Sequence, residues 1–136
     1  MAIKFHAVQR KDPRDRTLPG KYYAEIVNRY EISFEQFLNE ITDMSTVTVG
    51  DTYNVMQTSI HLMKKHLQEG RIVRLGDLGS FYLTISSDGK DAIDDVDAKS
   101  IVQANIRYRP SVKLKEILNR LSFQKTLVNG TQANGG

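Results

Sequence analysis

Apolar and polar residues alternate at the start of the chain and predict two short β-strands. In residues 3–8, Ile3, Phe5 and Ala7 share one side, and residues 21–27 alternate in the same way. The segment between them, residues 9–20, is rich in charge and closes with a Pro-Gly turn signal. The two strands are therefore candidates for pairing with each other across a charged loop.

A helical pattern replaces the alternation after residue 32. Ser33 and Gln36 form a capping-box sequence, and apolar residues follow at helical spacing through Met44. A second helix is predicted to begin near Thr48 and to stop at Gly70, which suits the left-handed position after a helix. Its apolar stripe, widened by two further residues, consists of Val49, Tyr53, Met56, Ile60, Met63 and Leu67, with Val55 and Leu62. So broad a stripe needs more partner surface than one short helix offers, and it predicts self-association.

After Gly70, apolar residues again recur at every second position, as they do in a β-strand. Residues 72–75 and 80–86 are predicted strands, separated by a glycine-containing interruption at 76–79, and residues 101–109 are a further strand. Together with the helices, these strands predict an α+β fold. Phe81, Tyr22 and Tyr23 are expected to belong to the core, and the alternative is that their rings serve as stacking platforms.

A last helix is predicted after Pro110, because Ser111 is placed to cap it. Its apolar residues are expected to face inward: Leu114, Ile117, Leu118 and Leu121. Residues 129–136, which contain three glycines, are expected to be disordered.

Composition excludes several classes of function. The chain has 136 residues, 40% of them hydrophobic, and no cysteine, which rules out disulfide scaffolds and thiol catalysis. No apolar run reaches the roughly 18 residues of a membrane span, and the N-terminus lacks the apolar block of a signal peptide. We therefore expect a cytoplasmic protein with no membrane partner.

Catalytic and metal-binding patterns are also missing. The histidines, His6, His61 and His66, are not spaced to converge on a metal ion, and there is no nucleophile motif or phosphate-binding glycine loop. We expect no enzyme activity, no cofactor and no small-molecule substrate.

The distribution of charge is more informative than the net charge of +3. Residues 1–30 carry seven basic and three acidic side chains, and residues 100–128 carry six basic and one acidic. Residues 88–99, by contrast, carry five aspartates and two lysines. Two basic ends flank an acidic middle, which indicates an anionic partner for particular surfaces.

Two segments resemble the HU/IHF family of bacterial histone-like proteins. Residues 70–83 resemble its apolar strand, glycine kink and following aromatic residue. Residues 107–115, Arg-Tyr-Arg-Pro-Ser-Val-Lys-Leu-Lys, resemble its return strand and closing helix. The resemblance covers residues 33–122. It implies an HU-like domain there, with a β extension at 1–32 like that of extended HU-like variants and a tail at 123–136.

The resemblance further implies an intertwined homodimer with a helical base and an antiparallel β saddle. Two protruding β-arms would reach around bent DNA through the minor groove. This chain departs from the family in its arm, residues 87–100, which is acidic and contains no proline. Ile93 and Val96 are the candidate apolar wedges that would replace the family's proline, and the alternative is that both pack within the arm. Thr84 and Ser86 stand where the family has arginines.

Six basic residues are the candidate DNA contacts: Arg71, Arg74, Arg107, Arg109, Lys113 and Lys115. Arg107 and Arg109 share one strand face, opposite the face of Ile106 and Tyr108. Both lysines lie in the first turn of the last helix, where cations oppose the helix dipole. That local cost favours a functional reason for them.

A further basic group lies near the N-terminus: Lys4, Arg10, Lys11, Arg14 and Arg16. These residues form either a flexible basic limb that contacts a nucleic-acid backbone or simply a charged surface loop.

The sequence thus predicts a homodimer that binds double-stranded DNA with little sequence preference, as a nucleoid-associated architectural protein. The alternative is an HU-fold module for protein interaction or assembly that has weak or lost DNA binding. The acidic arm favours the alternative, and the basic balance of residues 100–128 favours DNA.

Overall fold

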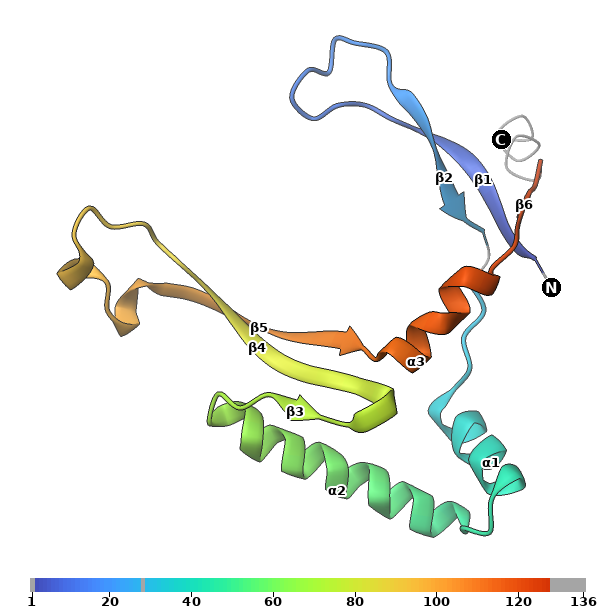
Figure 1. Ribbon diagram of the computed structural model, residues 1–136. Helices are drawn as coiled ribbons and strands as arrows, with labels where there is room; N and C mark the ends of the chain where they lie inside the picture. Colours follow the sequence, from blue (N-terminus) through green and yellow to red (C-terminus); the bar gives the residue numbers. More distant parts are fainter. Residues whose placement is uncertain (1, 28, 128–136) are drawn as a thin grey trace. The chain divides into compact units, whose positions relative to one another are not determined.

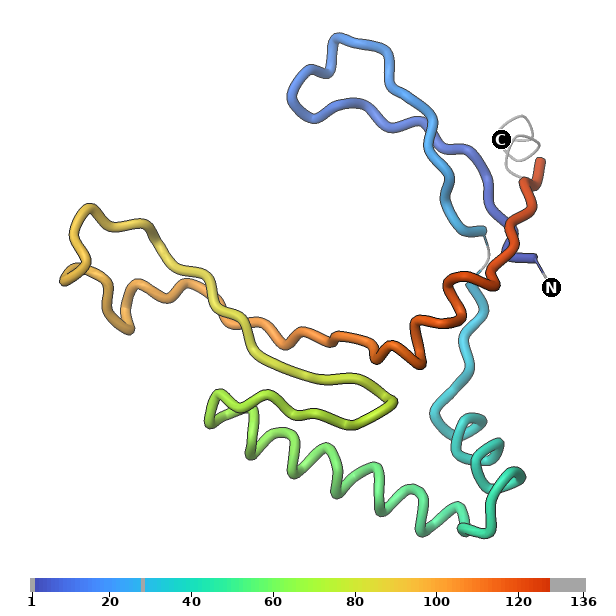
Figure 2. The backbone as a smooth tube through the Cα atoms, in the orientation of Figure 1, coloured from blue at the N-terminus to red at the C-terminus, as the bar shows by residue number. Residues whose placement is uncertain are grey.

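The computed structural model describes residues 2–27 and 29–127, and the chain divides into two compact units. The core unit comprises residues 33–116. The terminal unit comprises the described parts of residues 1–32 and 117–136. Figures 1 and 2 trace the backbone of both units. The predicted disorder of residues 129–136 lies outside the described residues.

The two helices of the core unit begin where their capping residues predict. Helix α1 spans Phe34–Met44, and the backbone N–H of Gln36 donates to the Ser33 hydroxyl at 3.1 Å, which is one half of the capping box. Helix α2 spans Val49–Gln68, and the Thr48 hydroxyl accepts from the backbone N–H of Asp51 at 3.1 Å.

Helix α2 ends in a Schellman motif, as the position of Gly70 predicts. Gly70 has φ +75°, and its N–H donates to the carbonyl of Leu67 at 2.9 Å. The N–H of Arg71 reaches back to the carbonyl of His66 at 3.1 Å. The chain therefore reverses sharply and enters the sheet that follows.

The core unit contains an antiparallel sheet in the order β3-β4-β5. Strand β3 spans only Val73–Arg74, shorter than the predicted 72–75, while β4 spans Gly79–Ser87 and β5 spans Ile101–Pro110. Helix α2 lies along this sheet beside β3 (Figure 1). Strands β4 and β5 continue into the arm, which carries short 3₁₀ turns at Ile93–Asp95 and Ala98–Ser100.

The interruption between β3 and β4 is a 3₁₀ turn, Gly76–Leu78, followed by Gly79 at φ +127°. A Cβ atom on Gly79 would collide with the carbonyl oxygen of Arg109 and would lie 2.9 Å from the ring of Tyr108. Only glycine satisfies both the backbone conformation and the close approach of β5.

We therefore expect Gly79→Ala to lower the free energy of unfolding by about 1–3 kcal/mol, the usual cost of such backbone strain. Gly89→Ala is the matched control, because a Cβ there meets no atom within 4 Å. Chemical denaturation at one protein concentration would compare the two variants. Equal stability of both would show that the kink tolerates a side chain.

The predicted last helix is shorter and more exposed than expected. Helix α3 spans only Val112–Lys115, and a 3₁₀ turn continues it over Glu116–Arg120. Its four apolar residues were predicted to face inward, but Leu114, Ile117, Leu118 and Leu121 are all exposed in the single chain. A four-residue helix followed by the tighter 3₁₀ turn does not keep the 3.6-residue period on which that prediction rests.

The terminal unit is a three-stranded sheet in the order β2-β1-β6. Strand β1 spans Ile3–Arg10 and pairs antiparallel with β2, Lys21–Ile26, which confirms the predicted hairpin. Strand β6, Phe123–Lys125, pairs parallel with β1 and was not predicted. The prediction of Tyr22 and Tyr23 as core residues is wrong, because both side chains are exposed on this thin sheet.

Few apolar side chains are buried within one copy of the chain. Among the described residues, Leu38 and Leu67 are the buried hydrophobic ones. Much of the predicted stripe on α2 stays exposed, including Val49, Tyr53 and Ile60. A groove of about 430 Å³ between α1 and α2 is lined by apolar side chains that include Phe34, Leu38 and Tyr53.

Candidate nucleic-acid interface

The register of β4 and β5 separates the core sheet into an apolar and a polar face. Directly paired residues of antiparallel strands share a face, and successive residues alternate. Phe81 is paired with Tyr108, and Leu83 with Ile106, on the apolar face. The opposite face, which we call the polar sheet face, carries the pairs of Ser80 with Arg109, Tyr82 with Arg107, and Thr84 with Asn105, together with Arg74 opposite Ser80.

Three of the predicted DNA contacts thus lie on one surface. Arg107 and Arg109 are exposed on β5, and Arg74 is exposed on β3 at the other side of β4. None of the three forms an ion pair with a residue in the described part of the chain. Their guanidinium groups remain available to an anion. Planar guanidinium forks are well suited to phosphate oxygens.

An aromatic ring contributes to the same face. The guanidinium of Arg109 lies over the ring of Tyr82, 5.4 Å from its centroid. This cation–π contact restrains a long side chain on the sheet surface. Tyr82 was not among the predicted site residues. The strand register identifies it, because Tyr82 is paired with Arg107 and therefore lies on the same face of the sheet as both arginines.

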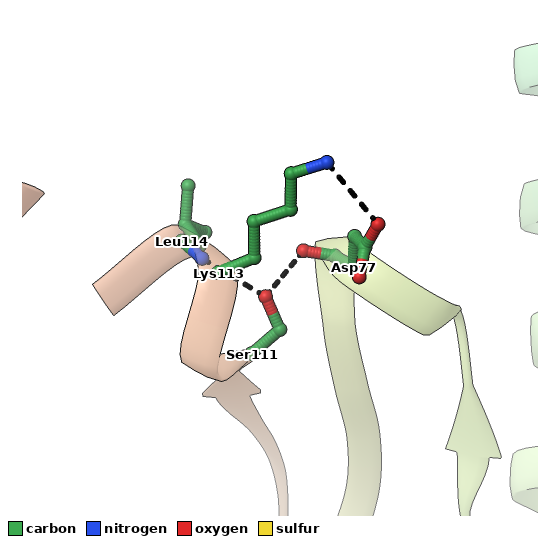
Figure 3. Close-up of polar contacts among 4 residues, drawn as sticks. All are labelled: Asp77, Ser111, Lys113 and Leu114. Atoms are coloured by element: carbon green, nitrogen blue, oxygen red, sulfur yellow. Dashed lines mark hydrogen bonds and ion pairs between the residues drawn. The ribbon is translucent and has the colours of Figure 1, made fainter. Parts of the chain in front are cut away.

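A set of polar contacts holds helix α3 against the kink before β4 (Figure 3). The Ser111 hydroxyl accepts from the backbone N–H of Leu114 at 3.0 Å and donates to the carbonyl of Asp77. The Tyr108 hydroxyl donates to the carbonyl of Leu78 at 2.5 Å. These bonds join the end of β5 to the kink and so fix where the two lysines of α3 lie.

The predicted lysines differ in their surroundings. The ammonium of Lys113 lies 3.5 Å from the Asp77 carboxylate, an exposed ion pair that bulk water screens. Lys115 is exposed and has no ion-pair partner among the residues described. Asp77 is a residue that the sequence reasoning missed, since nothing in its local pattern shows that α3 packs against the kink.

Arg71 is not brought to the polar sheet face. It lies between α2 and β3, where its guanidinium is 2.6 Å from the Glu69 carboxylate and 2.9 Å from Nδ1 of His66. Arg71 therefore secures the end of α2. Of the six predicted contacts, three lie on the polar sheet face and two lie on helix α3. The sixth, Arg71, lies on neither.

The arm is acidic and exposes an apolar side chain. Ile93 lies in the first 3₁₀ turn of the arm and is 88% exposed, while Val96 is 53% exposed. The alternative that Ile93 packs within the arm is wrong for this chain. Between the two 3₁₀ turns, Asp97 caps the second by accepting from the backbone N–H groups of Lys99 and Ser100.

Residues 2–27 and 29–127 contain no group of three or more His, Asp or Glu side chains positioned to hold a metal ion. In the same residues, no helix has the length and apolar character needed to cross a membrane.

Comparisons with known proteins are consistent with this geometry. The crystal structure of a protein from Bacteroides vulgatus, named "Putative bacterial DNA binding protein", superposes with a TM-score of 0.65 at 14% sequence identity. The match covers 91% of this chain and 48% of that one, so this chain spans about half the length of that protein. At this identity the match shows a shared fold. No curated protein matched the chain.

A family comparison covers nearly the whole chain. Residues 1–125 match HU-HIG, the family of HU domains fused to a winged helix-turn-helix, an immunoglobulin domain or a glycine-rich motif. The matched range includes the core unit with its polar sheet face and the described strands of the terminal unit. The chain therefore belongs to the HU-HIG family of HU-like proteins.

Proposed function

We propose that this protein binds double-stranded DNA with little sequence preference, as a nucleoid-associated architectural protein. The observation that carries the proposal is the polar sheet face, where Arg74, Arg107 and Arg109 are exposed together without internal ion-pair partners in the described chain. The HU-HIG membership and the named DNA-binding neighbour support it. Residues 33–122 form the DNA-binding domain in this proposal, and residues 1–32 extend it.

The chemistry of this face favours contact with the DNA backbone. Arginines here, with the lysines of α3, would neutralise phosphates and release condensed counterions, which gives affinity that falls with salt. The neighbouring hydroxyl and amide groups of Ser80, Thr84 and Asn105 can also bond phosphate or sugar oxygens. Such contacts fix a duplex in place without reading its bases.

We further propose that the functional species is a homodimer. The α2 stripe and the α1–α2 groove leave large apolar side chains exposed, among them Val49, Tyr53 and Ile60. Extended exposed apolar patches mark interaction surfaces. The apolar face of the sheet adds to this exposed surface, since Leu83, Ile85 and Ile106 are exposed as well. A second copy would cover these surfaces with matching apolar residues, as the family's intertwined arrangement implies.

An electrophoretic mobility shift with two duplexes of unrelated sequence tests the proposed function. We expect similar affinities for both at low salt and a parallel loss of binding at moderate salt. Failure to bind either duplex at low salt would contradict DNA binding. Strong preference for one duplex would contradict the architectural role.

The acidic arm is the observation that favours a second function, a protein-interaction or assembly module with weak DNA binding. Near a duplex, the arm's aspartates would repel phosphates.

If the arm lies beside bound DNA, Asp94→Asn/Asp95→Asn is expected to tighten binding several-fold at low salt. Glu40→Gln/Asp43→Asn, which removes two exposed charges from α1, is the matched control. Unchanged affinity in the arm variant would place the arm away from DNA and favour its use toward a protein partner.

A further inference from the structure

The β1–β2 hairpin concentrates positive charge that the polar sheet face does not include. Residues 10–21 carry five basic side chains and two carboxylates. Four of the basic side chains are exposed and form no ion pair with any residue in the described ranges: Lys11, Arg14, Arg16 and Lys21. The fifth, Arg10, lies 5.8 Å from the centroid of the Tyr23 ring and 3.7 Å from the Glu25 carboxylate.

The two carboxylates of the loop are used to fold it. Asp12 accepts from the backbone N–H of Arg14 at 2.8 Å. Asp15 accepts from the Thr17 hydroxyl at 2.5 Å and from the Thr17 N–H at 3.0 Å. The hydrogen bond from the Thr17 hydroxyl and, to a smaller extent, the bond from the Thr17 backbone N–H hold the pKa of the Asp15 carboxyl below its ordinary value. The acidic groups thus bond within the loop, whereas the arginines beside them make no ion pair with a described residue.

The base of the loop forms a concave surface where cations lie beside apolar residues. A pocket of about 520 Å³ is lined by Arg10, Lys11 and Lys21, together with Asp12, Leu18 and Tyr23. Gly20 is required there, because a Cβ on it would lie 2.7 Å from the carbonyl oxygen of Arg10. Asp12, Asp15 and Gly20 therefore shape the backbone of the loop, and its cations stay exposed on it.

We propose that this hairpin is a second phosphate-binding element, which contacts the phosphodiester backbone of double-stranded DNA through Arg14, Arg16 and the cations at its base. The inference rests on the proposed function, because it adds a contact to the same ligand. An anionic membrane is less suited to this turn. Basic helices that bind membranes lay a broad apolar face into the lipid. Residues 10–21 expose a single large apolar side chain among their cations, Leu18.

The test measures the salt dependence of binding by the full chain, with a fluorescent duplex of about 30 base pairs. Each lost phosphate contact lowers the slope of log Kobs against log salt by roughly 0.9. Arg14→Ala/Arg16→Ala is expected to lower the magnitude of the slope by one to two such steps and to weaken binding several-fold. Arg14→Lys/Arg16→Lys, which keeps both charges, should retain most of the slope.

Lys64→Ala/Lys65→Ala removes the same charge from exposed positions on α2 and should leave the slope unchanged. An equal loss in this control would attribute the effect to net charge and overturn the proposal. An unchanged slope in Arg14→Ala/Arg16→Ala, while the parent still binds DNA, would overturn the hairpin contact and leave the proposed function standing. If the parent binds no duplex at all, the hairpin contact and the proposed DNA-binding function are both contradicted.

Acetylation of lysines, read by mass spectrometry, gives an independent measure of contact. Adding the duplex should protect Lys11 and Lys21 and leave Lys64 and Lys65 unchanged. Binding of the parent to phosphatidylserine vesicles that is lost in Arg14→Ala/Arg16→Ala, with no protection of Lys11 or Lys21 by DNA, would assign the hairpin to membranes and overturn the proposal.

Discussion

Met56→Asp is expected to dissociate the homodimer or to unfold the chain. Met56 is at the middle of the α2 stripe and only partly buried in the single chain, so the proposed second copy would cover it. A carboxylate buried there without a partner costs several kcal/mol. Light scattering at micromolar concentration would detect dissociation of the dimer, and circular dichroism would detect unfolding.

His61→Asp is the control for this prediction. It introduces the same carboxylate at an exposed position about a third of a turn from the centre of the stripe. We expect it to remain dimeric and folded. A dimeric and equally stable Met56→Asp protein would show that the stripe is not the interface, and a parent that scatters as a monomer would contradict the homodimer itself.

Arg107→Ala/Arg109→Ala is expected to weaken DNA binding by roughly tenfold or more for each contact removed, since hydrogen bonds to charged groups contribute about 1.5 kcal/mol or more. The loss should be similar for different sequences, because phosphate contacts carry no sequence information directly. The salt slope should fall by roughly one unit per lost contact. Binding isotherms over a salt series would measure both quantities.

The stability of this variant must be followed alongside, because Arg109 also contacts Tyr82. An exposed cation–π contact contributes only about 0.5–1 kcal/mol, so the variant should stay folded. Lys64→Ala/Lys65→Ala again supplies a variant with the same change in charge. Parent-like affinity of a folded Arg107→Ala/Arg109→Ala protein at moderate salt would show that the DNA lies on another surface.

Local signals in the sequence predicted most elements of the core unit. Three of these signals are the caps at Ser33 and Thr48 and the glycine at position 70. Each acts through hydrogen bonds between residues close in sequence, so the local sequence is enough to predict it. The alternation in β4 and β5 likewise placed Arg107 and Arg109 on one face.

Features that depend on distant pairing could not be predicted in this way. Strand β6 has three residues and exists only through its pairing with β1, more than a hundred positions earlier. The contact of Ser111 with Asp77 spans 34 positions and needs the kink to be in place. Arg71 was predicted from its charge alone, but its guanidinium contacts Glu69 and His66 across the turn after α2.

The most direct test of the central claim is an NMR titration of the full chain with a short duplex, observing the arginine Nε–Hε signals. We expect the signals of Arg74, Arg107 and Arg109 to shift together and to saturate with the added DNA at low salt. The signal of Arg71, whose guanidinium contacts Glu69 and His66, should shift little. Unperturbed signals from all three sheet arginines in the presence of saturating duplex would contradict the assignment of the polar sheet face as the DNA-binding surface.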